Sequence, residues 1–470
     1  MVWKIARKEF REAVRDKRFL VSALIVGGLL LASLALGFKH NVEREREHRA
    51  AQDATERQWL DQGEKSPHGA AHYGVYAFKP QMPLAFVDRG IESFTGSAVW
   101  LEAHKQNDFR YRPAQDQTSL TRFGELTAAL VLQILLPLLI VLLTFNAFAG
   151  ERESGTLRQV LSLGIRPPQL AFGKILGLTA LLALLLIPAA VIGSIALSAA
   201  DWDADFSLSR LILMSAGYLL YLGVFVAVSL AVSARAASSR FALLALLGFW
   251  IVSCLILPRA ATDIVRRVYP TPSAMEFASR IESDIKNGAD SHNPADRRLA
   301  ELKIETMRKY GVQKLEDLPV NFDGIALQAG EDYGNQVFDR HYGDLWNRFA
   351  EQDSLRQATA IFAPVLAVSS VSRGLAGTDF AQQRDFAAAA ENHRRLLIRT
   401  INDHVLREVR YGDSKYTIGR ELWAQVPDFQ YSAPAAANVL REQTTSIAVL
   451  LFWFVGSMLL LLQSVKKMKV

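Results

Sequence analysis

The sequence predicts a membrane protein of mainly α-helical class. It has six transmembrane helices, cytoplasmic N- and C-termini and two large external insertions, the first mixed and the second mostly helical. Half of the 470 residues are hydrophobic although 21% are charged, a mixture that indicates apolar blocks alternating with water-facing blocks. Six apolar runs are long enough to cross a bilayer, and short basic segments flank them. These observations together predict the class.

The six predicted spans each reach the ~17–25 residues that a helix needs to cross a bilayer core. They are 19–38, 126–149, 170–199, 208–232, 241–258 and 445–464. The first could also be a cleaved secretory signal, but its 20 apolar residues exceed the ~7–15 of a signal core. We therefore interpret it as an uncleaved anchor.

The predicted orientation follows from the short connecting segments, which are basic. The N-terminal segment, the loops 150–169 and 233–240 and the C-terminal tail all carry Lys or Arg. With six spans these four segments fall on one side, which the positive-inside rule assigns to the cytoplasm. The long blocks 39–125 and 259–443 are then external.

The first external block, 39–125, opens with the alternating charges of residues 43–47. This pattern predicts that the first membrane helix continues into water as a solvated, ion-paired stalk. The middle of the block contains several Pro and Gly residues and is expected to be rich in turns and partly extended.

The second external block, 259–443, has the periodicity of helices. One helical face is apolar, and Arg394, Arg395 and Arg399 are expected on its other side; the apolar face carries Phe386, Ala390, Leu397, Ile401 and Val405. Residues 358–371 are apolar but too short to span. We interpret them as lying on the outer leaflet rather than in a core, because Pro364 would interrupt a buried helix.

The spans are expected to lack buried charge. Lys174 lies near the cytoplasmic end of the third span, where its stem can extend to the interface. The other polar side chains of the spans, such as Gln133, Tyr218 and Tyr221, are uncharged and only weakly polar. Ion-coupled transporters need ionisable groups inside the membrane, so the energy source is expected outside the bilayer.

Several site classes lack support in the sequence. The phosphate-binding loop G-x-x-x-x-G-K-[ST] is missing, since position 168 before Gly173-Lys174 is Pro. The single cysteine, Cys254, allows no disulfide framework.

His68 and His72 have metal-ligand spacing, but a structural pair is favoured because Pro67 and Gly69 are expected to weaken the helix. A metal site there stays open, and nucleic-acid binding is not supported because the external charges balance.

Residues 1–18 form a predicted amphipathic helix at the N-terminus. Trp3, Phe10 and Val14 lie on its apolar face, and Lys and Arg residues occupy the remaining surface. Such a helix lies in the membrane interface, with its cations toward anionic lipid. A simple basic topogenic tail is the alternative interpretation.

The loop 150–169 after the second span also predicts a short helix. Acidic residues favour a helix start, and Ser154 and Thr156 are candidate caps. A short charged helix between two spans suits the transmission of force from a soluble partner. By physical chemistry alone it could equally rest on the membrane.

The stretch 145–177, FNAFAGERESGTLRQVLSLGIRPPQLAFGKILG, resembles the signature of type-2 ABC exporter permeases. That signature is E-R-x-x-G-T-L, followed by a small-residue turn and a Gly-Lys pair. The positions that match are Glu151, Arg152, Glu153, Gly155, Thr156, Leu157, Gly173 and Lys174. The stretches 67–96 and 362–403 resemble a branch of the family whose external region is a domain of unknown function.

The resemblance implies a transmembrane exporter subunit of the bacterial inner membrane. Residues 1–18 would be its elbow helix. The loop would be its coupling helix, in contact with an ABC ATPase subunit through Glu151, Arg152, Glu153, Gly155, Thr156, Leu157 and Arg158. ATP and Mg²⁺ would be bound by that partner, so this chain would not itself be an enzyme.

The other implied partners are a second permease protomer, identical or paralogous, membrane lipid and a periplasmic protein. A membrane-anchored periplasmic binding or assembly module, with no transport role, is the alternative function. A periplasmic membrane-bound enzyme would need a convergent polar cleft in the external blocks.

Overall fold

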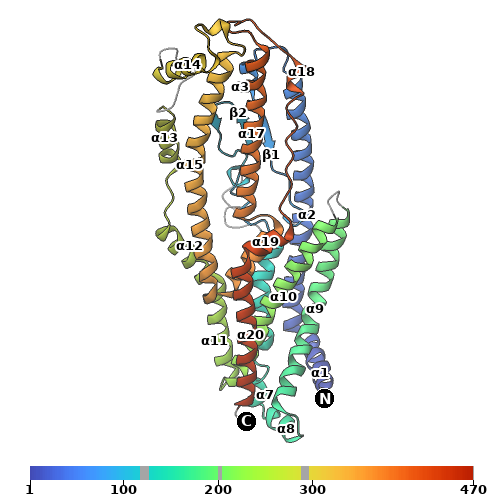
Figure 1. Ribbon diagram of the computed structural model, residues 1–470. Helices are drawn as coiled ribbons and strands as arrows, with labels where there is room; N and C mark the ends of the chain where they lie inside the picture. Colours follow the sequence, from blue (N-terminus) through green and yellow to red (C-terminus); the bar gives the residue numbers. More distant parts are fainter. Residues whose placement is uncertain (117–125, 200–203, 287–295, 469–470) are drawn as a thin grey trace.

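The computed structural model describes residues 1–116, 126–199, 204–286 and 296–468. Within these residues the molecule is elongated, with a bundle of candidate membrane helices in one half and long helices around a small sheet in the other (Figure 1). We call these the membrane half and the outer half. Both termini lie at the free end of the membrane half, together with the loop after the second span (Figure 1). The mainly helical class with six candidate membrane-spanning helices is confirmed.

Each predicted span overlaps a helix that is long and apolar enough to cross a membrane. The first, third, fourth and sixth are the helices α2 (Lys17–Leu60), α9 (Pro167–Ala199), α10 (Ala204–Arg235) and α20 (Thr444–Lys466). The second comprises α5 (Ala128–Leu130), the π-helix η2 (Val131–Leu135), α6 (Leu136–Thr144) and α7 (Ala149–Glu153). The fifth comprises α11 (Ser239–Ile251), the π-helix η3 (Val252–Ile256) and α12 (Leu257–Val268).

The two π-helices occur where proline interrupts helical hydrogen bonding. Pro137 has no N–H for the carbonyl of Gln133, which lies four residues earlier. Tyr221 on α10 donates its hydroxyl to that carbonyl at 2.7 Å, and the indole of Trp250 donates to the carbonyl of Ile134 at 3.0 Å. Side chains of neighbouring helices thus satisfy backbone groups that lipid would leave unpaired.

Helix α2 is 44 residues long and extends from the membrane half into the outer half, as predicted for the stalk. Its outer part is not simply solvated. The amide of Asn41 donates to the carbonyl of Met82 at 3.1 Å, and the indole of Trp59 donates to the carbonyl of Trp423 at 2.9 Å. The stalk therefore forms one wall of the outer half.

The sheet of the outer half has three antiparallel strands in the order β1 (Val75–Phe78), β2 (Ala98–Glu102) and β3 (Lys105–Gln106). Val75 pairs with Leu101, and Glu102 pairs with Lys105. Helix α3 (Pro67–Tyr73) precedes the sheet and α4 (Pro113–Asp116) follows it.

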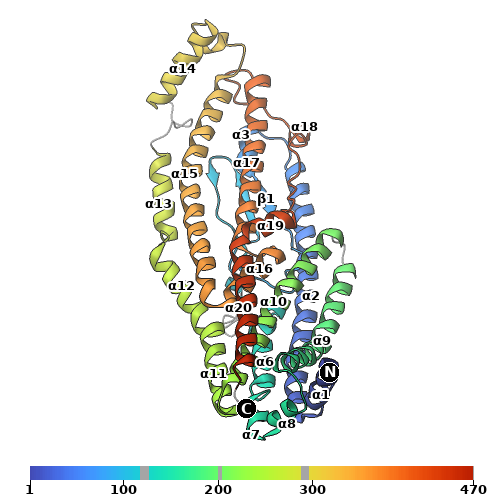
Figure 2. The same ribbon diagram turned by 60° about the horizontal axis from the view of Figure 1, so that its bottom comes forward.

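The longest elements of the outer half are α15 (Phe322–Thr359) and α17 (Phe380–Glu408), which lie side by side (Figures 1 and 2). Between them the chain forms the short η5 (Ala360–Phe362) and α16 (Pro364–Ala376). The other helices described in the second external block are α13 (Ala274–Ile285), α14 (Arg297–Tyr310), η4 (Leu315–Asp317), α18 (Arg420–Trp423) and α19 (Ala436–Glu442).

The prediction that residues 358–371 lie on the outer leaflet is wrong. Helix α16 packs against α10 and α20, and Leu366, Ala367 and Val368 are buried within the protein. Pro364 does not interrupt a helix, because it occupies the first helical turn, where a missing N–H costs nothing.

The predicted position of Arg394 is also wrong. The apolar face of α17 is buried as expected, but Arg394 is buried with it and only 1% of its side chain is exposed. Its guanidinium lies between Glu331 and Glu391, at 3.0 and 2.9 Å. Arg395 and Arg399 are more exposed, as predicted. Arginine enters this core because carboxylates satisfy its donors.

The expectation of uncharged spans is wrong at Arg210, which lies within the predicted span 208–232 and is 1% exposed. Its guanidinium donates to the carbonyl of Leu375 at 3.0 Å and to the carbonyl of Pro434. The Leu375 carbonyl lies in the last turn of α16, and the Pro434 carbonyl lies in the segment before α19. Backbone acceptors in both places lack helical partners. Arg210 thus connects α10 to two segments of the second external block.

Candidate functional site

The predicted functional segments meet at the free end of the membrane half. Helix α1 (Val2–Arg15) packs against α9, and α7 and α8 (Thr156–Ser162) lie nearby (Figure 2). The close packing of α1 on α9 depends on two glycines. A Cβ added at Gly173 would lie 2.5 Å from Ile5 Cγ2, and one at Gly177 would lie 2.8 Å from Glu9 Cβ. This explains why a glycine precedes Lys174.

Lys174 does not extend to the interface as predicted, since only 1% of its side chain is exposed. Its ammonium lies 2.8 Å from Glu9 Oε1 and 3.0 Å from Glu151 Oε1, with the ring of Phe148 at 5.3 Å. Lys8 Nζ approaches the same oxygen of Glu151 at 3.2 Å. We call Lys8, Glu9, Glu151 and Lys174 the Lys174 cluster; it connects the loop to α1 and α9.

Arg152, which follows Glu151 in the loop, caps the end of the fourth span. Its guanidinium donates to the carbonyls of Ala234 and Ala236, each at 2.6 Å. These carbonyls terminate α10, where the helix dipole places partial negative charge. A cation at this position therefore stabilises the end of α10 and ties it to the loop.

Glu153 caps the start of the fifth span. Its carboxylate accepts hydrogen bonds from the backbone N–H of Ser239 at 2.9 Å and from the Ser239 hydroxyl at 2.7 Å. The N-terminus of α11 carries partial positive charge and unsatisfied N–H groups, which favour a carboxylate. Arg152 and Glu153 thus hold both ends of the turn between α10 and α11.

The join between α6 and α7 is held by Ser233 on α10. Its hydroxyl donates to the carbonyl of Phe145 at 2.8 Å. The same oxygen accepts from the backbone N–H groups of Phe148 and Ala149 at 3.0 and 3.2 Å. The second span therefore enters the loop against a fixed point on the fourth.

Helix α8 begins after Gly155, whose φ of +75° lies in the left-handed region that favours glycine. The hydroxyl of Thr156 donates to the carbonyl of Glu151 at 3.2 Å and tightens this turn. Leu157 is 1% exposed and anchors α8 in the core, whereas Leu163 at its end is 77% exposed. Arg158, Gln159 and Ser162 are also exposed. We call Arg158, Gln159, Ser162 and Leu163 the α8 surface.

The residues predicted to contact an ATPase thus separate into two groups. Glu151, Arg152, Glu153 and Leu157 contact the chain's own helices, and Gly155, Thr156 and Arg158 are exposed. Sequence reasoning missed the partners Glu9, Ser233 and Ser239. They lie far from the loop in sequence, and their residue types carry no signal of pairing.

The elbow residues also divide between two environments. The predicted helix is present, but its buried residues are Ile5 and Ala6, against α9. Phe10 and Val14 are half-buried, and Trp3 is 76% exposed. The large exposed indole leaves an apolar surface suited to the membrane interface.

The membrane half also contains an apolar cavity of about 510 Å³ between α2, α9, α10 and α20. Its lining includes Leu34, Leu182, Met214 and Phe454, with Thr179 among the few polar groups. Such a lining favours an apolar molecule or an apolar portion of a larger one.

Comparison with known proteins matched two parts of the chain. Residues 3–269 match the model of the ABC-2 family transporter proteins. Residues 274–432 match a domain of unknown function, DUF3526. No curated protein matched the chain.

Proposed function

This chain belongs to the ABC-2 family of transporter proteins, and from that premise we propose that it is the permease subunit of an ATP-driven exporter. Its helices make it a multi-pass membrane protein, and membership of the family implies partnership with an ABC ATPase subunit. ATP and Mg²⁺ would be bound by that ATPase, which supplies the energy that this chain transmits.

The observation that carries the proposal is the arrangement of three consecutive residues. Glu151 binds Lys174 on α9, Arg152 binds the end of α10, and Glu153 binds the start of α11. The second span ends in this same segment. A displacement of the loop therefore acts on four spans through short polar contacts rather than through a flexible linker.

The proposed docking surface for the ATPase is the α8 surface. Leu157 anchors α8 internally, whereas Arg158 and Leu163 are both exposed, the first in the helix and the second at its end. A short exposed segment that carries a leucine, a cation and polar groups is suited to a protein contact. The predicted contact residues Glu151, Arg152 and Glu153 would then relay the force, while α8 makes the contact.

We propose that the transport path forms between two protomers in the bacterial inner membrane, with the outer halves on the periplasmic side. Closure of the ATPases would push α8 and tilt the second and third spans. Pro137, beside the π-helix η2, and Pro188 within α9 are the positions where these spans would bend. The apolar cavity supports a substrate with an apolar portion.

The test is purification of the full chain with its co-purifying ATPase, followed by assays in proteoliposomes. The double variant Arg158→Glu, Leu163→Asp should bind the ATPase with at least about tenfold lower affinity, because it reverses a charge and removes an apolar contact. Its thermal stability should be unchanged, since both side chains are exposed. Arg410→Glu, an exposed arginine of the second external block, is the matched control.

Three results would overturn the proposal: ATP hydrolysis by the chain alone, no ATPase in the purified complex, or full coupling in the double variant. Absence of an ATPase would favour the alternative, a membrane-anchored periplasmic binding or assembly module without transport, whereas full coupling in the double variant would contradict the α8 surface as the docking surface.

A further inference from the structure

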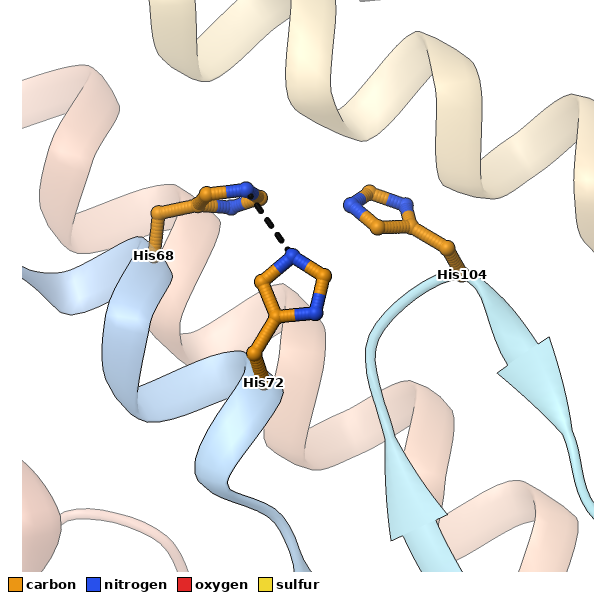
Figure 3. Close-up of side chains that lie close together, drawn as sticks. All are labelled: His68, His72 and His104. Carbon is orange, nitrogen blue, oxygen red and sulfur yellow. Dashed lines mark hydrogen bonds between the residues drawn. The ribbon is translucent and has the colours of Figure 1, made fainter. Parts of the chain in front are cut away.

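Three histidines of the first external block meet in the outer half. His68 and His72 lie on α3, and His104 lies in the turn between β2 and β3 (Figure 3). One ligand nitrogen from each side chain lies within 4.8 Å of the other two. Figure 3 shows the three rings turned toward a common point. The sequence indicated the first pair but gave no sign of the third residue, which is distant along the chain.

The pair on α3 is held by a well-formed helix start. Pro67 occupies the first turn, and the hydroxyl of Ser66 accepts from the N–H of Gly69 at 3.1 Å. The expected weakening by Pro67 is therefore wrong, because proline is favoured at this position. The Nε2 atoms of His68 and His72 lie 3.1 Å apart. Two nitrogens bound tetrahedrally at ~2.05 Å from a zinc ion lie about 3.3 Å apart.

His104 is positioned by two contacts to one carboxylate. It adopts φ +63°, a region that non-glycine residues seldom occupy. Its backbone N–H donates to Glu331 Oε1 at 2.7 Å, and its ring Nδ1 lies 2.9 Å from the same oxygen. With Nδ1 held by the carboxylate, Nε2 is the ring nitrogen that faces His68 and His72 (Figure 3).

Glu331 is itself held in place by Arg394. It is 3% exposed, and its other oxygen lies 3.0 Å from the Arg394 guanidinium. A carboxylate that contacts the far nitrogen of a histidine orients the ring and increases its basicity toward a metal. The turn itself is attached to α3, because the N–H of Ala103 donates to the carbonyl of Ala71 at 3.0 Å.

We propose that His68, His72 and His104 bind a divalent transition metal ion, with Glu331 as the positioning residue behind His104. Three imidazoles favour Zn²⁺ or Cu²⁺ over Mg²⁺ and Ca²⁺, which prefer oxygen ligands. His72 is exposed, so an ion reaches the site from solvent and keeps a coordination position for water or a further ligand. Binding requires only that the three rings turn closer together.

The experiment uses the full chain, purified without a polyhistidine tag, stripped with chelator and titrated with ZnCl₂ by calorimetry. The expected result is one ion per chain. His72→Ala and His104→Asn should each weaken binding by about tenfold or more, and Glu331→Gln by about 10–100-fold. Asparagine tolerates the left-handed conformation at 104, which keeps the turn folded. His404→Ala, outside the cluster, is the matched control and should bind as the unchanged chain does.

Cobalt substitution supplies a second readout. Co²⁺ bound by three imidazoles and water should give visible absorption bands of a four-coordinate ion in the unchanged chain, and these bands should disappear in His72→Ala. Binding of much less than one Zn²⁺ per chain, or equal affinity in His104→Asn and the unchanged chain, would overturn the proposal. Neither result depends on an ATPase, so the test is independent of the proposed transport function.

Discussion

The membrane half and the outer half each contain a cation that is almost fully buried between two carboxylates, and the two are built differently. Lys174 meets Glu9 and Glu151, whose side chains remain 18% and 15% exposed. Arg394 meets Glu331 and Glu391, which are 3% and 11% exposed. The first site borders solvent, and the second lies inside a core.

The contact geometry differs as well. Lys174 makes single contacts with two oxygens, and an ammonium keeps them while it rotates. Arg394 donates to both oxygens of Glu391, at 2.9 Å each, and also to Glu331 and Asn335. A planar guanidinium with this many partners fixes one orientation. Lys174, at the site where movement is proposed, thus makes adaptable contacts, whereas Arg394, which holds Glu331 behind the histidines, makes rigid ones.

The largest effect is expected for Arg394→Met. Removing this cation takes the shared partner from two buried carboxylates, Glu331 and Glu391, and the free energy of unfolding should fall by about 3–5 kcal/mol. Denaturant unfolding of the purified chain measures the loss. Arg399→Met on the same helix, where the side chain is 63% exposed, is the control and should change little. Equal effects of the two variants would contradict the difference between the halves.

Lys174→Met should lower the free energy of unfolding by less, about 2–3 kcal/mol, because the partly exposed carboxylates of Glu9 and Glu151 can be rehydrated. It should also reduce ATPase coupling, since the loop would lose its contact with α9. The control is Lys4→Met, an exposed lysine on α1. A loss of stability as large as that of Arg394→Met would show that the Lys174 cluster is as rigid as the outer site.

Tyr221→Phe tests whether the Tyr221 hydroxyl satisfies the Gln133 carbonyl, which Pro137 leaves without a helical N–H donor. The variant removes the hydroxyl that donates to the Gln133 carbonyl and that also contacts Cys254 Sγ at 3.6 Å. The free energy of unfolding should fall by about 0.6–1.7 kcal/mol. Thermal unfolding in lipid nanodiscs measures it, with the exposed Tyr310→Phe as control. An unchanged midpoint would mean that the hydroxyl does not satisfy this backbone group.

The smallest effect is a pH dependence in the outer half. Burial lowers the pKa of His393 below its ordinary value, against an opposing effect of Asp428. The unfolded chain therefore binds the proton more readily. The contribution of His393 to stability is complete above about pH 6.5 and decreases as the pH falls toward the folded pKa. Unfolding midpoints from pH 8 to 5 should decline less in His393→Phe, and equal slopes would contradict this cause.

The sequence predicted features that depend on composition and period. Hydropathy indicated the spans, and the charge pattern of residues 43–47 predicted the continuation of α2 into the stalk. The amphipathic pattern of residues 1–18 predicted α1. These features are local, so the residues that determine them lie within one window of the chain.

Features that depend on pairing between distant residues were missed or predicted wrongly. Arg394 was placed on a solvated face because its partner Glu331 is far along the chain. Arg210 is stable in its span because the carbonyls of Leu375, at the end of α16, and of Pro434 accept its hydrogen bonds. His104 carries no metal signature by itself, since its relation to His68 and His72 exists only after the sheet and α3 pack.

In the proposed orientation, α8 faces the cytoplasm and the outer half lies on the opposite side of the membrane. With the buried Cys254 replaced by Ala, single cysteines are introduced by Ser162→Cys in α8 and Ser414→Cys in the outer half. A membrane-impermeant maleimide is then applied to spheroplasts. We expect immediate labelling at 414 and labelling at 162 only after the membrane is opened. Labelling of 162 in sealed spheroplasts would contradict it.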